Sequence, residues 1–327
     1  MRFLSPTPSL TATMRHALLS LLAVSSIAAQ TPERLFQERK FDEARAVSKA
    51  QLAANKNDAN AMYWMGRIAD AQGKNGEAIE WYEKAVKQED NSALYHYWLG
   101  DALGEAAQTA SKLRQPFLAR RLKSEFERAV ALDPKMIDAR QGLVDFYSMA
   151  PGFMGGGMDK AREQVAEITK LSPMRGHLAG ARVADREKDL VGAEREYQAA
   201  ISVAPDSAQA YYSLGQWYRR QSKWDDAFAT YERLMKAKPE DIVAHLGWGA
   251  VSALSGKSLD RGERELKHFL ANATASAGTQ NFAGAHFRLG QIYEKTARKD
   301  QAKAEYSEAV KINPQHADAK KALEALK

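Results

Sequence analysis

The chain has 327 residues, of which 45 % are hydrophobic, and a formal net charge of +6. This length and hydrophobic fraction allow two ordinary domains or one long repeat array, and they exclude a disordered polymer. The charge is too mild to indicate nucleic acid as a partner. The chain contains no cysteine, which excludes disulfides, thiol catalysis, cysteine zinc sites and a bacterial lipoprotein anchor.

Residues 1–29 are predicted to be a secretory signal peptide. Arg15 and His16 precede an apolar run, and small residues follow it, so we expect cleavage after Ala28 or Ala29. Met14 is an alternative start, and an uncleaved interfacial anchor is the alternative to cleavage. No later segment approaches the roughly 20 apolar residues that span a bilayer. We therefore expect a soluble mature chain without a transmembrane segment, periplasmic or secreted, and the lack of cysteine favours a bacterial periplasm.

One set of residues recurs at identical intervals along the chain. The first copy is Leu214, Gly215, Tyr218, Ala227, Tyr231 and Pro239. The second copy is Leu289, Gly290, Tyr293, Ala302, Tyr306 and Pro314. Gly66 and Gly100 are 34 residues apart, as are Gly215 and Gly249. Such a fixed period indicates a repeat architecture.

This pattern resembles the tetratricopeptide repeat family, and the resemblance covers nearly all of the chain after the signal peptide. It implies an all-α fold, a right-handed α-solenoid of helical hairpins. The glycine after the leucine lets the second helix of a hairpin approach closely, and the aromatic residue of that helix fills the space beside it. The proline ends the second helix and starts the next unit.

On this template, residues 30–58 are an N-terminal half repeat or cap, and residues 317–327 are a C-terminal capping helix. Seven units are predicted between them, at residues 59–92, 93–136, 137–173, 174–207, 208–241, 242–282 and 283–316. The 174–207 unit has Gly180 and Ala181 where the Leu-Gly pair would stand, and the 242–282 unit has Gly262 in the alanine position.

Two units carry insertions between their paired helices. In residues 93–136, ten extra residues separate Leu103 from Leu122, which predicts two lengthened helices with Pro116 in the first turn of the second. In residues 137–173, five extra residues lie between the paired helices, in the glycine-rich stretch SMAPGFMGGGMDK. Insertions of this kind map to one edge of a solenoid.

The glycine-rich stretch lacks the Gly-Lys-Ser/Thr ending of a phosphate loop, so it does not indicate nucleotide binding. Asp159 is the predicted N-cap of the helix that follows. The apolar residues Phe153, Met154 and Met158 are predicted to pack toward Phe117 and Leu118 on the lengthened hairpin, with partner contact as the alternative.

Four histidines occupy the same position in four units: His96, His177, His245 and His286. Ligands of one metal ion must converge, whereas residues one or more repeats apart on a solenoid do not, so the histidines are predicted to pack between helices. Acidic pairs such as Glu240 and Asp241 stand at predicted helix starts, where carboxylates cap free N–H groups. The sequence contains no recognisable catalytic triad, zinc motif or dinucleotide fingerprint. We predict no enzyme activity, no metal and no cofactor.

The resemblance implies that the first helix of each unit faces a concave groove that binds peptide segments. Spacing assigns the following residues to this groove: Tyr63, Arg67, Tyr97, Asp101, Arg182, Arg186, Tyr212, Gln216, Arg219, Arg220, Phe287 and Gln291. Arg182, Arg186, Arg219 and Arg220 are predicted to form one basic groove for an acidic or carboxylate-ended peptide, because Arg binds carboxylates in a bidentate manner. The alternative is an ordinary solvated helix face.

These observations predict a non-catalytic scaffold or adaptor of the cell envelope that binds an extended, acidic peptide or a partner protein. The alternative within the binding class is a glycan-binding adaptor in polysaccharide export or cell-wall assembly. The enzyme alternative predicts a closed pocket with a buried carboxylate or histidine cluster.

Overall fold

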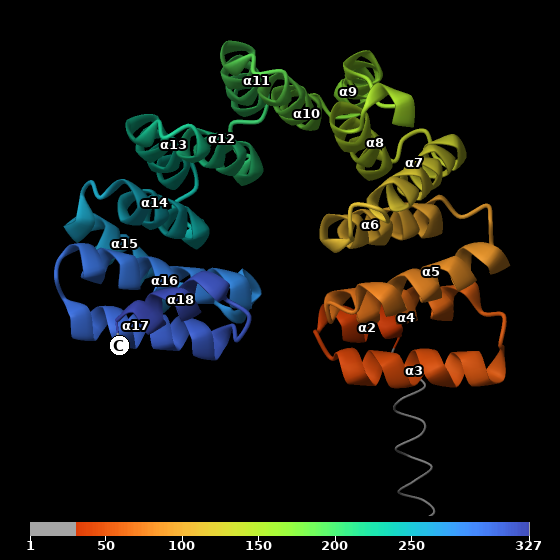
Figure 1. Cartoon of the computed structure of the whole chain (residues 1–327), viewed down its shortest axis with the longest axis horizontal. Helices are drawn as coiled ribbons and strands as arrows, with labels where there is room; N and C mark the ends of the chain where they lie inside the picture. The colour runs from red at the N-terminus through yellow and green to blue at the C-terminus, as the bar shows by residue number, and fades with distance from the viewer. Residues whose placement is uncertain (1–30, 327) are drawn as a thin grey trace, which may run out of the picture. The chain divides into compact units, whose positions relative to one another are not determined.

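The computed structural model describes residues 31–326, and this part of the chain is all-helical (Figure 1). It comprises seventeen α-helices and two short 3₁₀ helices, and the described residues include no strand. The predicted signal peptide lies outside the described residues. No helix between residues 31 and 326 is long and apolar enough to cross a membrane. The predicted class, an all-α solenoid of helical hairpins, is confirmed.

The described chain divides into two compact units, residues 31–164 and 165–326. The first unit contains α2 (Pro32–Gln37), α3 (Phe41–Ala54), α4 (Ala59–Ala71), α5 (Asn75–Gln88), α6 (Ala93–Thr109), α7 (Gln115–Leu132), α8 (Ile137–Met149) and η1 (Gly152–Met154). The unit boundary falls within α9 (Met158–Leu171).

The second unit contains α10 (Pro173–Arg186), α11 (Leu190–Val203), α12 (Ala208–Arg220), α13 (Trp224–Ala237), α14 (Ile242–Ser255), α15 (Leu259–Asn272), η2 (Ala275–Ala277), α16 (Thr279–Lys295), α17 (Lys299–Ile312) and α18 (Ala317–Ala325). Helix α16 begins before residue 283, where the sequence pattern starts the last unit. Consecutive helices pack side by side within each unit, as α4 with α5 and α12 with α13 (Figure 1).

Close approach of paired helices depends on glycine facing a tyrosine ring. A Cβ atom added to Gly215 on α12 would lie 2.7 Å from the Tyr231 ring on α13, which no real side chain tolerates. The same ring would be 2.4 Å from a Cβ on Gly247 of α14. Tyr231 is buried between these two glycines, so one aromatic side chain joins its own hairpin to the next.

The insertion in residues 93–136 lengthens both helices of that hairpin, α6 and α7, as predicted. Helices α6 and α7 have 17 and 18 residues, whereas α4 and α5 have 13 and 14. Pro116 is the second residue of α7, where its missing N–H costs no helical hydrogen bond.

The glycine-rich stretch is a tight turn between α8 and α9. Gly155 has φ +90°, and a Cβ on Gly156 would lie 1.8 Å from the Ala150 carbonyl oxygen, so both positions require glycine. Helix α9 begins at Met158, and the prediction that Asp159 is its N-cap is therefore wrong. Asp159 lies in the first turn of α9, where its carboxylate still favours the positive end of the helix dipole.

The predicted packing of Phe153 toward Phe117 is wrong, because these side chains are 84 % and 63 % exposed. Leu118, the next residue on α7, is buried in the core of the first unit instead. Met154 is half-buried and lines a cavity together with Pro116. Successive residues of a 3₁₀ turn point in different directions, so only one of the pair Phe153 and Met154 faces α7. Met158 is half-buried at the start of α9.

Candidate partner-binding faces

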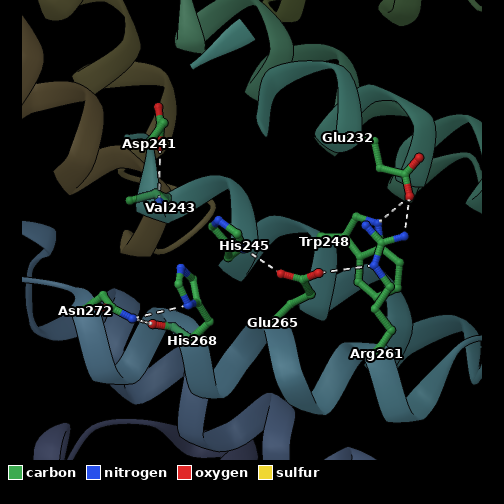
Figure 2. Close-up of polar contacts among 9 residues, drawn as sticks. All are labelled: Glu232, Asp241, Val243, His245, Trp248, Arg261, Glu265, His268 and Asn272. Atoms are coloured by element: carbon green, nitrogen blue, oxygen red, sulfur yellow. Dashed lines mark hydrogen bonds and ion pairs between the residues drawn. The ribbon is translucent and has the colours of Figure 1, made fainter. Parts of the chain in front are cut away.

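Each of the four repeated histidines contacts a glutamate on the second helix of its own hairpin. The Nδ1 atom lies 2.6 Å from Glu125 for His96, 2.8 Å from Glu196 for His177, 2.5 Å from Glu265 for His245 and 2.6 Å from Glu305 for His286. Figure 2 shows the pair formed by His245 on α14 and Glu265 on α15. The described residues contain no group of three or more candidate metal ligands. These histidines therefore join paired helices.

The glutamate partners were not identified from the sequence, although their spacing is nearly constant. Glu196 and Glu305 follow their histidines by 19 residues, and Glu265 follows by 20. Glu125 follows His96 by 29 residues, because the ten inserted residues lie between them. A search for a recurring His–Glu spacing would have found this set.

His96 is the most deeply placed member of this set. Its side chain is 5 % exposed, and Nε2 lies 3.0 Å from the Asp90 carbonyl oxygen. Burial alone would lower the pKa of His96, but the contacts with Glu125 and Asp90 raise it above its usual value. The protonated imidazole, with both nitrogens as donors, is therefore favoured in the folded protein.

A second polar cluster joins three helices of the second unit (Figure 2). Arg261 on α15 donates hydrogen bonds to Glu232 on α13 at 2.6 Å and to Glu265 at 3.1 Å. Its guanidinium lies 4.2 Å from the ring centroid of Trp248 on α14. Burial alone would raise the pKa of Glu265, but hydrogen bonds from His245 and Arg261 lower it. These contacts join α13, α14 and α15.

The residues predicted to line the groove all lie on the first helices of their hairpins, but two of them are core residues. Tyr63 on α4 is 4 % exposed and stacks on Tyr95 at 5.3 Å between ring centroids. Phe287 on α16 is 7 % exposed and lies 5.7 Å from the Tyr306 ring. Packing between helices covers most of both rings, so the assignment of Phe287 to a partner-contacting surface is wrong, whereas Tyr63 still lines a cavity of the first unit.

Arg67 on α4 lies beside a cavity of about 530 Å³ in the first unit. Its guanidinium is 3.5 Å from the Trp98 ring centroid and 5.0 Å from that of Phe36, and Nη1 donates to the Tyr63 hydroxyl at 3.0 Å. The Arg67 Nε group is buried and has no hydrogen-bond partner among the described residues. Trp64 and Phe36 also line this cavity, which makes it aromatic with one cationic wall.

The remaining predicted groove residues differ in their burial and contacts: Tyr97, Asp101, Tyr212 and Gln216. Tyr97 on α6 is half-buried, with its ring 6.1 Å from that of Phe126. The Tyr212 hydroxyl on α12 donates to Asp241, which also caps α14 by accepting from the Val243 N–H. Gln216 is exposed on the same helix as Tyr212.

The structure brings Arg182 and Arg220 together around one tyrosine. Burial raises the pKa of Tyr197, and the nearby charges of Arg220 and Arg182 oppose this rise. Arg220 also forms an ion pair of 3.4 Å with Asp185, which accepts a hydrogen bond from the Trp217 indole at 2.7 Å. Both guanidinium groups therefore lie at the junction of α10, α11 and α12. Arg186 is half-buried on α10.

Arg219 lies elsewhere, next to an arginine that the sequence reasoning missed. Arg288 on α16 has a pKa lowered by burial and by the nearby charge of Arg219, and the charge of Asp318 opposes this lowering. Arg288 donates to Gln291 at 2.7 Å, whereas the Arg219 side chain forms no hydrogen bond or ion pair with any described residue. Consecutive residues on an α-helix point about 100° apart, which explains why Arg219 and Arg220 diverge. The predicted single basic groove is therefore two pairs, Arg182 with Arg220 and Arg219 with Arg288.

Comparison with known families decides what these hairpins are. A family model described as "TPR repeat" matches residues 71–106, and two described as "Tetratricopeptide repeat" match residues 178–242 and 283–316. The chain is a tetratricopeptide repeat protein.

The sequences of three curated relatives match parts of this tetratricopeptide repeat protein. The "Cellulose synthase operon protein C" of Pseudomonas fluorescens is 24 % identical over 239 residues, and that of Xanthomonas axonopodis pv. citri is 26 % identical over 228 residues. These matches cover 60 % and 65 % of the chain but only 18 % and 14 % of the relatives. The "Probable biofilm formation methyltransferase WspC" of Pseudomonas aeruginosa is 33 % identical over 100 residues, which are 31 % of this chain and 22 % of that protein. The tetratricopeptide repeat protein thus spans less than a quarter of each relative.

Solved structures of other tetratricopeptide repeat proteins share the fold. A tetratricopeptide repeat protein from Parabacteroides merdae is 13 % identical, with a TM-score of 0.51 over 82 % of this chain and 98 % of that one. A monomeric mutant of IFIT1, solved with Gppp-AAAA, is 15 % identical, with a TM-score of 0.53 over 90 % of this chain and 70 % of that one. These similarities extend to the fold alone.

Proposed function

We propose that this protein is a non-catalytic scaffold of the cell envelope that binds a protein partner through the first helices of its hairpins. Tetratricopeptide hairpins form extended binding surfaces and build few enclosed sites, which supports a scaffold over an enzyme. The names of the relatives from Pseudomonas fluorescens and Xanthomonas axonopodis support an envelope role. Export by cleavage of residues 1–29 and a periplasmic or secreted location belong to the same proposal.

Within the second unit, the proposed ligand is an extended peptide with acidic side chains. The observation that carries this proposal is the guanidinium of Arg219, which lies near Arg288 without an anionic partner among the described residues. Two neighbouring guanidinium groups repel each other, and Asp318 offsets this only at Arg288, so a ligand carboxylate at Arg219 would reduce the remaining repulsion. Arg182 and Arg220 would supply a second subsite for an anionic group of the ligand, near Tyr197.

A labelled oligo-glutamate peptide tests this proposal by fluorescence anisotropy with the full-length mature protein. The double variant Arg182→Glu with Arg219→Glu should bind at least about tenfold more weakly, because each change replaces attraction with repulsion. The wild-type affinity should also fall as salt is raised. The matched control is Arg195→Glu on α11, whose side chain is 74 % exposed and lies outside both arginine pairs. Equal affinity of the double variant and the wild type would contradict the proposal.

The second candidate is binding of a glycan at the aromatic cavity of the first unit. Phe36, Trp64 and Arg67 line this cavity, and aromatic faces with polar neighbours are typical of sugar subsites. The names of two relatives refer to a cellulose synthase operon. Titration of cellohexaose should quench tryptophan fluorescence in the wild type and have no effect in Trp64→Ala. An unchanged spectrum in the wild type would reject the glycan candidate.

A further inference from the structure

The first unit contains an apolar groove that the arginine faces do not explain. It has a volume of about 870 Å³ and lies between the lengthened pair α6 and α7 and the end of α8 with its glycine-rich turn. Its apolar lining is formed by Pro116, Ala119, Leu122, Phe146, Met149 and Met154. Both insertions into the repeat pattern therefore contribute walls to one groove.

Exposed apolar side chains are concentrated in the chain segments that form this groove. Four of the five most exposed large apolar side chains among the described residues are Leu113, Met149, Phe117 and Phe153, and the fifth is Val191 in the second unit. Met149 lines the groove, and the other three are next in sequence to lining residues. Single exposed apolar residues are ordinary, but a group of this size at one groove indicates an interaction surface.

The charged side chains that line the groove are mostly acidic, with Asp101, Glu105 and Asp145 against Lys112. Asp101 and Glu105 lie one turn apart on the same face of α6, and both line the groove. Neither carboxylate forms a hydrogen bond or an ion pair with another described residue. Burial raises the pKa of each and the charge of Asp70 adds to both effects, whereas the charge of Arg67 opposes the rise at Asp101. Asp101 is half-buried and Glu105 is exposed, and two neighbouring carboxylates without an ion pair favour a cationic group from outside the chain.

We propose that this groove binds a cationic amphipathic segment of a partner protein. Its apolar residues would occupy the groove between α7 and α8, and its lysine or arginine side chains would pair with Asp101 and Glu105. Charge complementarity selects this occupant, since an acidic segment or an anionic membrane surface would be repelled by the α6 wall. The site is separate from the arginine pairs of the second unit and opposite to them in charge.

Gly104 gives a direct way to block the groove. It lies on α6 among the lining residues, and a Cβ added there would have no neighbour within 4 Å. Gly104→Phe should therefore place a ring in the groove without disturbing the core, which circular dichroism and thermal unfolding would verify. Asp101→Asn with Glu105→Gln removes the charge of the wall while keeping the side-chain shapes.

The probe is a fluorescent synthetic amphipathic helix of leucine and lysine, compared with a helix of leucine and glutamate in the same order. The full-length mature protein should bind the leucine–lysine helix at least about tenfold more tightly than the leucine–glutamate helix. Gly104→Phe, Met149→Ser and the Asp101→Asn, Glu105→Gln pair should each weaken binding, by about tenfold for Gly104→Phe. Val191→Ser is the matched control, because Val191 is 79 % exposed on α11 and does not line the groove.

Three results would overturn the proposal. The first is equal affinity for the two helices, which would remove charge complementarity. The second is unchanged affinity of Gly104→Phe for the leucine–lysine helix. The third is binding of the protein to phosphatidylglycerol vesicles that Phe153→Ser abolishes while peptide binding stays intact, which would make the apolar cluster a membrane contact. Because Arg182 and Arg219 lie in the other unit, failure here leaves the acidic-peptide proposal standing.

Discussion

At the scale of single residues, the charged groups of this protein fall into two kinds. The charged groups between paired helices have hydrogen-bond partners, as in the contact of His96 with Glu125 and in the hydrogen bonds of Arg261. Those on the first-helix faces include groups without partners, such as Arg219 and Asp101. The satisfied groups stabilise the hairpins, and the unsatisfied groups are the ones that a ligand can engage.

His96 should make stability depend on pH. Its pKa in the folded protein is raised above the unfolded value of 6.5, so its contribution is fully present below pH 6.5 and is lost as pH rises through the folded value. The stability difference between wild type and His96→Gln should therefore be larger at acidic than at alkaline pH. Urea unfolding of both proteins at two pH values, about 5.5 and about 8, measures this, and a difference that does not change with pH would contradict the assignment.

Glu263 on α15 should contribute stability with the opposite pH dependence. Burial alone would raise its pKa, but hydrogen bonds from Arg298, Lys267 and Tyr293 lower it to about 2. Its contribution is therefore present above the unfolded value of 4.5 and is lost as pH falls toward about 2. At neutral pH, Glu263→Gln should lower the free energy of unfolding by about 1–3 kcal/mol.

The control for Glu263 is a surface pair of similar chemistry. Glu308 accepts from Lys311 at 2.9 Å, and the two side chains are 39 % and 75 % exposed. Exposed pairs contribute little, so Glu308→Gln should change the free energy of unfolding by less than about 1 kcal/mol. Equal losses for Glu263→Gln and Glu308→Gln in chemical denaturation would show that the Glu263 cluster is not stabilising.

At the scale of helices, the hairpin is held by glycine facing an aromatic ring. Tyr231 packs between Gly215 and Gly247, and Tyr82 packs against Gly66 in the first unit. The His–Glu contacts join other helix pairs, namely α6 with α7, α10 with α11, α14 with α15 and α16 with α17. Close packing at glycine and, in these four hairpins, a polar contact therefore hold the paired helices together.

A matched pair of glycine substitutions tests this packing. Gly215→Ala places a methyl group 2.7 Å from the Tyr231 ring and should lower the free energy of unfolding by about 1–3 kcal/mol through overpacking. Gly104→Ala meets no neighbouring atom and should raise it by about 0.5–1 kcal/mol through helix propensity. Thermal or urea unfolding measures both, and a stabilised Gly215→Ala variant would refute the packing argument.

The sequence predicts the hairpins well because their packing depends on a local pattern that repeats. The 34-residue period places Gly66, Gly215, Tyr231 and Tyr306 correctly, since each position faces its own partner helix. It does not predict the direction of Arg219, because that depends on α16 more than sixty residues later in the chain. The exposure of Phe153 depends on the conformation of an irregular turn, which no repeat period encodes.

At the scale of the whole molecule, each unit carries its own candidate binding surfaces on its first helices. The first unit presents Asp101 and Glu105 beside an apolar groove. The second unit presents the arginine pairs, with Arg219 unpaired among the described residues. A scaffold with two such surfaces can bind partners of different chemistry at once, which is the proposed role of this protein.

Hydrogen–deuterium exchange of the full-length mature protein with and without an oligo-glutamate peptide tests the central claim most directly. The account predicts slower exchange in α10, α12 and α16, which carry Arg182, Arg219 and Arg288, and unchanged exchange in α4 and α6. The Arg182→Glu with Arg219→Glu variant should lose this protection. Protection confined to the first unit, or protection that persists in that variant, would contradict the assignment of the acidic-peptide site.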